Sequence, residues 1–232
     1  LVLKRKKSKY RVTRNQTHSF QRMVFKGGAM KVLVACEYSG RVRDAFTRLG
    51  HDAVSVDLLP TETEGRHIQG DVLDVLESEQ FDLMVAFPPC THLAVSGARY
   101  FEEKRADGRQ QSALEFVQSL MDAPVERIAL ENPVGIISSV IRKPDQIIQP
   151  WMFGEDASKK TCLWLKNLPK LEPTKIIRKD IYANQTPSGQ NKLGPSEDRA
   201  KIRSLTYQGI ADVMAEQWGS QETMEGYPLR LL

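Results

Sequence analysis

The sequence predicts an α/β fold in which helices cover both faces of a doubly wound, mostly parallel sheet. From Met30 onward, short apolar runs alternate with segments of helical periodicity, and this alternation is typical of such sheets. A chain of 232 residues is long enough to bury one hydrophobic core and is more naturally one domain than two. None of its apolar runs approaches the roughly 20 residues that a membrane-spanning helix needs. We therefore expect one folded domain and no membrane partner.

Five apolar runs have the length and composition of core strands. They are Lys31–Ala35, Ala53–Asp57, Leu83–Phe87, Arg127–Glu131 and Thr161–Leu165. Between the first two runs, Arg41–Leu49 is predicted to be a helix that ends at Gly50, because glycine commonly follows the last helical turn.

Two further helices are predicted from apolar residues at helical spacing. The segment Gln110–Met121 has an apolar face formed by Ala113, Phe116, Val117 and Leu120. The last helix has a similar face formed by Ile210, Val213, Met214 and Trp218. We expect both faces to pack in the core.

The two ends and one internal stretch differ from this body in composition. Residues 1–29 carry nine Lys or Arg, no acid and no period, which predicts a disordered or non-native leader and a native start at Met30. An arm that follows DNA phosphates is the alternative for this leader. Residues 168–203 are rich in Pro, Gly, Asn, Gln and Lys without a period, which predicts a long loop or a very small subdomain. The expected domain is 30–219, followed by a tail at 220–232.

The three cysteines, Cys36, Cys90 and Cys162, form no C-x-x-C pair, and the chain has only four histidines. A zinc site of ordinary spacing is therefore not expected, and we expect no metal. The cysteines do not suggest a disulfide framework, which favours a reducing, cytoplasmic setting.

Polar residues follow the first two predicted strands at their carboxyl ends, where open α/β sheets bind ligands. The turn after the first strand carries four candidate ligand residues, Glu37, Tyr38, Ser39 and Gly40. The N–H groups where this turn enters a helix are expected to receive a polar or anionic ligand group. Asp57 stands where an acid binds ribose hydroxyls, with a solvated strand-end carboxylate as its alternative. Asp71 is expected either to contact an adenine amino group or to cap a helix.

The strand Leu83–Phe87 runs into the sequence Phe-Pro-Pro-Cys at 87–90, which is the most informative strand end. Two prolines fix the backbone and remove donors, so that Cys90 is presented on a rigid turn above the sheet. A core cysteine is the usual alternative, but core packing gives no reason for the prolines. Glu131 ends the next strand and precedes a proline in the same way, so we expect Cys90 and Glu131 over one cleft. A thiolate beside a carboxylic acid suits attack on an electron-poor ring.

Taken together, these residues resemble the DNA cytosine-C5 methyltransferase family over most of 30–219. Pro89-Cys90 followed by Gly97 resembles the catalytic Pro-Cys motif of the family, and Glu131-Asn132 resembles its Glu-Asn motif. The Lys-Thr-Cys-Leu-Trp-Leu strand at 160–165 is similar to a strand of the small phage-encoded members. Residues 206–210 resemble the last cofactor-side motif of the family, which packs against the first.

The resemblance implies a Rossmann-like fold, S-adenosyl-L-methionine as cofactor and double-stranded DNA as partner. Cys90 would add to C6 of a cytosine flipped out of the duplex, while Glu131 engages N3 and the exocyclic amine. The implied cofactor contacts are Glu37, Tyr38, Ser39, Gly40, Asp57, Asp71 and Pro88. The implied substrate contacts are Pro89, Asn132, Lys159 and Lys160. The two lysines either take over the contacts of a missing Gln-x-Arg-x-Arg segment or are ordinary surface lysines. The expected setting is a monomer in the cytoplasm of a bacterial or phage-infected cell.

The family places a large target-recognition domain where this chain has only residues 168–203. This segment is basic through Lys170, Lys175, Arg178, Lys179, Lys192, Arg199, Lys201 and Arg203. Basic side chains bind phosphates, but the segment offers little scaffold for contacts to many bases. We therefore expect a short recognition sequence or low sequence specificity.

Other interpretations remain open. An amino-methyltransferase would carry an acid or amide at Phe87 and an aromatic residue at Cys90, and this chain departs from both. A binding protein that kept the fold and lost catalysis is compatible with a glycine-rich motif reduced to Gly40. Cysteine addition to a free nucleotide, in another pyrimidine modification, is a third possibility. A cysteine hydrolase is disfavoured because no histidine is evidently paired with Cys90, and His92 would have to turn back to reach it.

Overall fold

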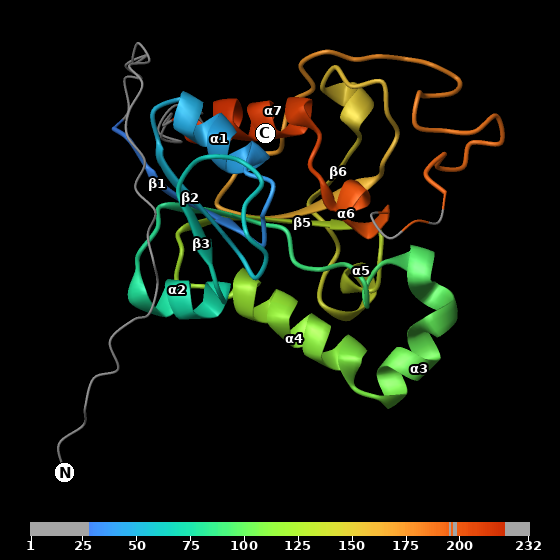
Figure 1. The fold of residues 1–232 in the computed structure, drawn as a ribbon, viewed down its shortest axis with the longest axis horizontal. Coiled ribbons are helices and arrows are strands. Elements are labelled where there is room, and N and C mark those ends of the chain that lie inside the picture. Colours follow the sequence, from blue (N-terminus) through green and yellow to red (C-terminus); the bar gives the residue numbers. More distant parts are fainter. Residues whose placement is uncertain (1–27, 195, 197–198, 221–232) are drawn as a thin grey trace, which may run out of the picture.

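The computed structural model describes residues 28–194, 196 and 199–220. The predicted leader, apart from Gly28 and Ala29, and the predicted tail, apart from Ser220, lie outside the described residues. Seven strands form one sheet with helices on both of its faces (Figure 1).

The strands follow the order β3-β2-β1-β4-β5-β7-β6 across the sheet. Their bounds are β1 (Lys31–Ala35), β2 (Asp52–Asp57), β3 (His67–Gln69), β4 (Leu83–Ala86), β5 (Arg127–Pro133), β6 (Gln146–Ile148) and β7 (Thr161–Lys166). β7 runs antiparallel to both β5 and β6, and the other neighbouring pairs are parallel. The chain first winds to one side of β1 and then crosses to β4 on the other side. The predicted doubly wound, mostly parallel α/β sheet of Rossmann-like type is confirmed.

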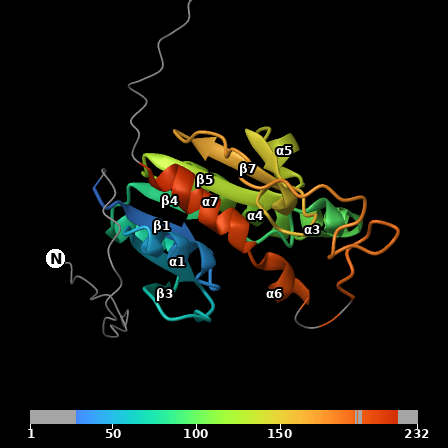
Figure 2. The same ribbon diagram turned by 90° about the horizontal axis from the view of Figure 1, so that it is seen from above.

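Helices cover the two faces of the sheet unequally. The α-helices of the described residues are α1 (Arg41–Arg48), α2 (Val72–Ser78), α3 (Phe101–Ala106), α4 (Arg109–Met121), α5 (Ile137–Val140), α6 (Arg199–Ser204) and α7 (Gln208–Gly219). Two 3-10 turns are η1 (Val95–Tyr100) and η2 (Pro150–Met152). α1 and α7 pack side by side on one face, and α2, α4 and α5 pack on the other (Figures 1 and 2). No helix in the described part of the chain combines the length and apolar character needed to cross a membrane.

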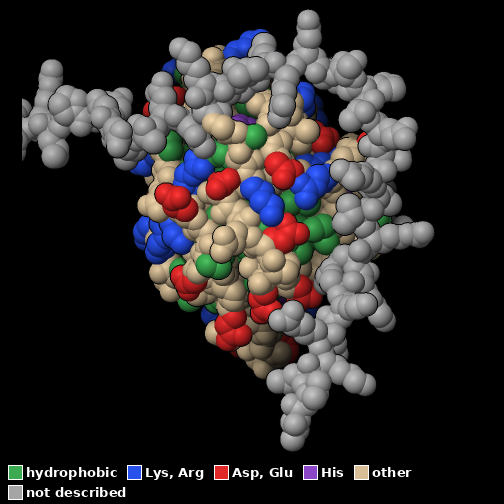
Figure 3. Space-filling model, turned by 90° about the vertical axis from the view of Figure 1, so that its left-hand side faces the viewer, with side chains coloured by type: hydrophobic (Ala, Val, Ile, Leu, Met, Phe, Trp, Pro, Cys, Tyr) green, Lys and Arg blue, Asp and Glu red, His purple; other side chains and the backbone are tan. Residues whose placement is uncertain are grey.

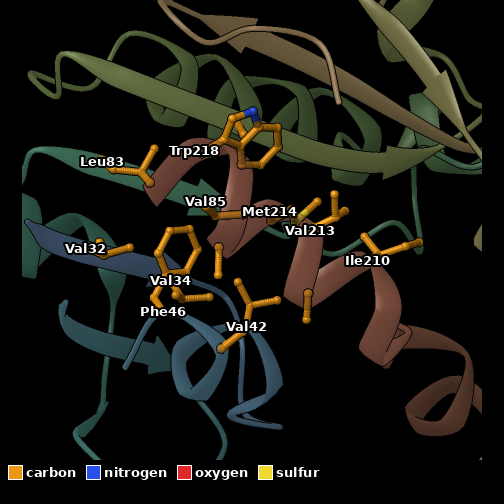
Figure 4. Close-up of a cluster of buried hydrophobic side chains, with 14 of the residues drawn as sticks. Val32, Val34, Val42, Phe46, Leu83, Val85, Ile210, Val213, Met214 and Trp218 are labelled. Atoms are coloured by element: carbon orange, nitrogen blue, oxygen red, sulfur yellow. The ribbon is translucent and has the colours of Figure 1, made fainter. Parts of the chain in front are cut away.

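Strand β1 is buried on both faces because its alternate side chains enter two different cores. Val32 and Val34 pack with α1 and α7, whereas Leu33 and Ala35 pack with the helices of the opposite face. Figure 4 shows the first core, in which Phe46 of α1 meets side chains of α7 and of the central strands. Each such burial contributes about 1.5–3 kcal/mol. The two cores thus hold the carboxyl ends of the central strands at fixed spacing.

The structure contains both predicted core helices, and the buried face differs from the prediction only in α4. The predicted face of α7 is confirmed, since Ile210, Val213, Met214 and Trp218 are all buried. In α4, Val117 and Leu120 are buried as predicted, but Leu114 rather than Ala113 lies at the centre of the contact. Ala113 and Phe116 pack at its margin, because that side of α4 faces away from the sheet.

Some strands end at other residues than predicted, because pairing with a neighbouring strand determines where each strand ends. β5 extends two residues beyond Glu131, because β7 pairs with it as far as Pro133 and Thr161. β4 ends at Ala86, one residue before the predicted end, although the N–H of Phe87 still donates to the carbonyl of Ala35 at 2.9 Å. β3 and β6 were not predicted, since three residues are too few to show a period.

The segment between β7 and α6 is a long loop, which confirms the prediction for most of residues 168–203, although the end of that stretch, from Arg199, belongs to α6. Its described residues form no helix or regular strand, and the isolated bridges Phe153 to Lys175 and Gln185 to Asn191 are its main backbone pairings. Tyr182 of this loop stacks on Trp151, with ring centroids 6.4 Å apart. The loop is therefore fastened to the η2 region by backbone bonds and one aromatic pair.

Candidate functional site

The order of the strands reverses between β1 and β4, and the candidate residues lie beyond the carboxyl ends of these strands and their neighbours. In open α/β sheets this is the position in which ligands bind. Two groups of residues meet here, one around the turn after β1 and one around the ends of β4 and β5.

Residues 36–40, which we call the first turn, are held by the carboxylate of Glu37. This carboxylate is buried and accepts hydrogen bonds from the N–H groups of Val42 (2.8 Å) and Arg43 (3.4 Å) and from the hydroxyl of Ser39 (3.0 Å). Burial raises the pKa of Glu37, and the same hydrogen bonds oppose that rise. Glu37 therefore acts as an acceptor for the amino end of α1.

The N–H groups at the amino end of α1 therefore have hydrogen-bond partners within the chain. Besides the two bonded to Glu37, the N–H of Arg41 contacts the Ser39 hydroxyl at 3.4 Å and that of Asp44 donates to Gly40 at 2.8 Å. The expectation that these helix-end groups receive an anionic ligand group does not hold for this conformation. Contact between a cofactor and the first turn stays a prediction.

The first turn also binds the segment that precedes α7. The hydroxyl of Tyr38 donates to the carbonyl of Lys201 (3.1 Å) and lies 3.2 Å from the hydroxyl oxygen of Ser204. Arg41 donates to the carbonyl of Thr206 at 2.8 Å. The packing of residues 206–210 against the first motif, which the resemblance implied, is confirmed at Thr206.

Cys36, Asp57 and Asp71 come together at the ends of β1 and β2. Burial raises the pKa of Cys36 to about 12, and the negative charges of Asp57 and Asp71 add to that rise. Cys36 also has a left-handed backbone, with φ of 58°, which a non-glycine residue rarely adopts and which often marks a functional turn.

Each of the two carboxylates has a local partner. Asp57 accepts from the N–H of Leu59 at 2.9 Å, and burial raises its pKa. Asp71 is the N-cap of α2 and accepts from the N–H of Leu73 at 2.9 Å, so its predicted alternative role as a helix cap is confirmed. A carboxylate has about four acceptor positions, so both retain the capacity to bind a ligand.

Residues 87–94, which we call the nucleophile loop, form a tight turn centred on Cys90. The carbonyl of Cys90 accepts from the N–H groups of Leu93 and Ala94, both at 3.0 Å. Pro88 is buried and Pro89 is exposed, with Cys90 between these extremes. The side chain of Asn132 donates to the carbonyl of Pro88 at 2.8 Å and ties the loop to the end of β5.

Gly135 permits the close contact between the nucleophile loop and the chain after β5. The N–H of Ile136 donates to Leu93 (2.9 Å), and the N–H of Val95 donates to Val134 (3.0 Å). A Cβ atom at Gly135 would lie 2.2 Å from the carbonyl oxygen of Leu93, which no side chain allows. The sequence interpretation did not single out this glycine, which shapes the candidate site.

Cys90 and Glu131 lie close enough to influence each other, as predicted from adjacent strand ends. Burial raises the pKa of Cys90, the carboxylate of Glu131 adds to that rise, and the cations of Lys159 and Arg203 oppose it. Burial also raises the pKa of Glu131, against the charge of Lys159 and a hydrogen bond with Thr161. Thr161 and Arg203 are thus neighbours of the pair that the sequence did not single out.

The two predicted lysines differ in position. Lys159 is partly buried and its ammonium group donates to the carbonyl of Arg203 at 2.9 Å, which brings the end of α6 to the Cys90–Glu131 pair. Lys160 is exposed and has no such link among the described residues.

Two buried polar atoms in this region have no partner among the described residues. They are Oδ1 of Asn132 and Nδ1 of His92. Unpaired buried polar atoms are rare and cost about 1–3 kcal/mol each, so they mark places where a ligand or a water molecule completes the bonding.

Two hollows are found near these elements. One of about 430 Å³ lies beside the nucleophile loop on the side of α4. It is lined by Pro89, His92, Asp107, Gly108, Arg109, Ser112, Ala113 and Phe116. Its lining includes neither Cys90 nor Glu131. The other, of about 220 Å³, lies between α1 and α7, away from the strand ends. Within the described ranges no three His, Cys, Asp or Glu residues gather as a metal site would require.

Comparison with known proteins gives no family assignment. No family model matches the chain, and no curated protein matches it. It is similar to the crystal structure of an E. coli protein assigned as a DNA modification methyltransferase encoded within a prophage, with 15% identity and a TM-score of 0.44. The match covers 64% of this chain and 52% of that one, so the chain spans about half the length of that protein. At this TM-score the two share part of a backbone arrangement, from which nothing about activity follows.

Proposed function

We propose that this protein is an S-adenosylmethionine-dependent methyltransferase that modifies C5 of cytosine in DNA through a covalent adduct with Cys90. The observation that carries the proposal is the proximity of the Cys90 thiol to the Glu131 carboxyl at the ends of adjacent strands. A nucleophile next to an acid suits addition to a pyrimidine ring, in which one position of the ring is attacked and another gains charge.

Cys90 and Glu131 act on opposite sides of the same ring in this mechanism. The thiolate of Cys90 forms a bond to C6, and Glu131 holds a proton at N3, so that electron density is directed to C5. S-adenosylmethionine, when bound, supplies the methyl group that C5 accepts. Loss of the C5 proton and cleavage of the bond from sulfur to C6 then restore the aromatic ring and release Cys90.

The electrostatic surroundings suit these roles. Because burial raises the pKa of Glu131, its carboxyl keeps a proton at a higher pH than an exposed glutamate does. The pKa of Cys90 is also raised, so its thiol needs help to ionise. Lys159 and Arg203 provide that help, since their positive charges favour the thiolate.

The cofactor is assigned to the group formed by Cys36, Asp57 and Asp71. The chemistry of this donor set fits, since two carboxylates with free acceptor positions suit ribose hydroxyls and an adenine amino group. We propose Asp57 for the ribose and Asp71 for the adenine, with Pro88 and the first turn (Glu37, Tyr38, Ser39 and Gly40) along the rest of the cofactor. The strained backbone of Cys36 is consistent with a turn shaped by a ligand rather than by stability alone.

The DNA is assigned to the edge that carries the long loop after β7. Its described basic residues include Lys170, Lys175, Arg178, Lys179 and Lys192, and Arg203 lies near Cys90. The face seen in Figure 3, which is the left-hand side of Figure 1, instead carries acidic and basic side chains in mixture. With Pro89, Asn132, Lys159 and Lys160 around the reacting base, double-stranded DNA is held through its phosphates, and few bases are recognised.

The test is to express the full chain in cells that lack cytosine methylation and to measure modified bases in digested DNA by mass spectrometry. We expect 5-methylcytosine from the wild type and none from Cys90→Ser. Cys162→Ala is the matched control, because Cys162 is buried in β7 and packs in the core formed with α2, α4 and α5.

Binding of S-adenosylmethionine is measured on the same proteins by calorimetry and is expected to be unchanged in Cys90→Ser. A folded wild type that binds S-adenosylmethionine but leaves DNA unmodified would overturn the choice of substrate. N4-methylcytosine or N6-methyladenine in place of 5-methylcytosine would overturn the covalent mechanism.

A further inference from the structure

Two buried polar side chains from outside the nucleophile loop bind the two carbonyl groups that directly follow Cys90. The ammonium group of Lys104, on α3, donates to the carbonyl of Thr91 at 2.6 Å. The amide of Gln110, on α4, donates to the carbonyl of His92 at 3.1 Å. Lys104 is 7% exposed and Gln110 is 2% exposed, so both donors are buried, whereas Thr91 and His92 lie nearer the surface.

Lys104 is buried without a carboxylate partner. None of the ion pairs among the described residues includes it, and its Nζ lies 5.8 Å from the centroid of the Tyr100 ring. An ammonium removed from water without a carboxylate partner destabilises a fold relative to an apolar side chain of the same size. Stability alone therefore gives no reason for a lysine at this position.

The nucleophile loop has few bonds of its own that would fix the chain after Cys90. Pro88 and Pro89 have no N–H group, and the internal bonds of the loop run from Leu93 and Ala94 back to Cys90. Thr91 and His92 are spanned by this turn, and their carbonyls are held by α3 and α4. A bond from a charged donor is shorter and stronger than one between neutral groups, which agrees with the 2.6 Å at Thr91.

We propose that Lys104 and Gln110 are positioning residues that hold the backbone after Cys90 and thereby fix the direction of its thiol. They touch neither the base nor the cofactor, and they act through the carbonyls of Thr91 and His92. The benefit for catalysis rests on the proposed function, because it presumes that Cys90 attacks a substrate. The fixing of the loop does not depend on that function.

The experiment compares Lys104→Met and Gln110→Met in the full chain. Each removes the donor and keeps an apolar stem of similar length. Lys104→Arg retains a charged donor, and the matched controls are Arg105→Met and Gln111→Met, which change exposed neighbours on the same helices. Two quantities are measured: the alkylation rate of Cys90 by iodoacetamide, from peptide mass spectrometry, and kcat and KM for methyl transfer to DNA. Cys36 and Cys162 in the same molecule report on the integrity of the fold.

We expect alkylation of Cys90 to become about tenfold faster in Lys104→Met, because loss of one bond to a charged donor shifts local opening by about that factor. Methyl transfer should slow by about tenfold or more in kcat, with KM for S-adenosylmethionine unchanged, because a misdirected thiol is more accessible but less productive. Gln110→Met should show the same pattern more weakly. Lys104→Arg, Arg105→Met and Gln111→Met should match the wild type.

The inference is overturned if Cys90 is alkylated at the wild-type rate in both methionine variants. It is also overturned if Cys36 and Cys162 accelerate together with Cys90, because the effect is then on the whole fold. If the wild type transfers no methyl group to DNA, the proposed function fails, and the alkylation rates still decide whether Lys104 and Gln110 hold the loop.

Discussion

The candidate site at the strand ends has two halves, which are stabilised in different ways. Around the first turn, polar groups bond to each other: Glu37 binds the amino end of α1, and Asp71 caps α2. Around the nucleophile loop, bonds donated by side chains of other elements, Asn132, Lys104 and Gln110, add to the bonds within the turn. The carboxylates of the first half thus serve the backbone next to them, whereas the second half depends on side chains that come from β5, α3 and α4.

The largest expected effect is the loss of catalytic rate in the Glu131→Gln variant. The amide keeps the shape but does not hold an exchangeable acid proton at N3, so kcat should fall by about 10²–10⁴-fold. Binding of S-adenosylmethionine should be unchanged, because Glu131 belongs to the other half of the site. Steady-state methylation assays and calorimetry measure the two quantities. A normal kcat would show that Glu131 does not act on the ring.

A smaller effect is expected in the first half from Asp57→Asn. Loss of a charged acceptor should weaken binding of S-adenosylmethionine by roughly 10–100-fold, the equivalent of one hydrogen bond to an ionised group. The rate at saturating cofactor should change little. Asp71→Ser is the companion variant, because serine preserves the cap of α2 while it removes the carboxylate. Equal affinity in Asp57→Asn and the wild type would remove the ribose assignment.

Glu37→Gln tests whether the first turn is held by its own groups. Its carboxylate bonds to Val42 and Arg43 resemble those of a helix cap, and we expect a loss of about 1–2 kcal/mol in the free energy of unfolding. Urea denaturation followed by circular dichroism gives the number. If stability is unchanged while cofactor affinity drops, Glu37 serves the ligand and the contrast between the two halves fails.

The smallest effect is a shift in the pH dependence of Cys90 reactivity in Lys159→Met. The cation of Lys159 lowers the pKa of the Cys90 thiol against the larger effect of burial, so its removal should raise that pKa further. Less thiolate is then present at any given pH, and the curve of alkylation rate against pH moves to higher pH. Lys160→Met serves as the control, since Lys160 is exposed and is expected to leave the curve unchanged.

The sheet and the pairing of Cys90 with Glu131 were predictable from the sequence because both depend on local patterns. Apolar runs mark strands, and residues just after parallel neighbouring strands meet at one edge. The bonds of Lys104 and Gln110 were not predictable. Charged and amide side chains on a helix are ordinarily exposed, and only the approach of the nucleophile loop, more than ten residues earlier in the chain, makes them buried.

Gly135 and the cap formed by Glu37 were missed for a similar reason. A glycine after a strand has many explanations, and the close approach of Leu93 is visible only when the two loops are adjacent. The turn after β1 was interpreted as an open receptor for a ligand, because helix-end N–H groups usually lack partners. Glu37 accepts from the N–H group of Val42, five residues later, and it was not recognised as the partner of that group.

The long loop after β7 is fixed at both ends, by β7 itself and by the bonds of Tyr38, Arg41 and Lys159 to the segment 201–206. The entropy cost of closing such a loop grows only logarithmically, by about 0.6 kcal/mol for each doubling of its length. The exposed turn at Ser188-Gly189 can therefore accept extra residues at little cost to the sheet. The length of this loop and the stability of the sheet are thus set by separate stretches of chain, and the first can change in evolution without the second.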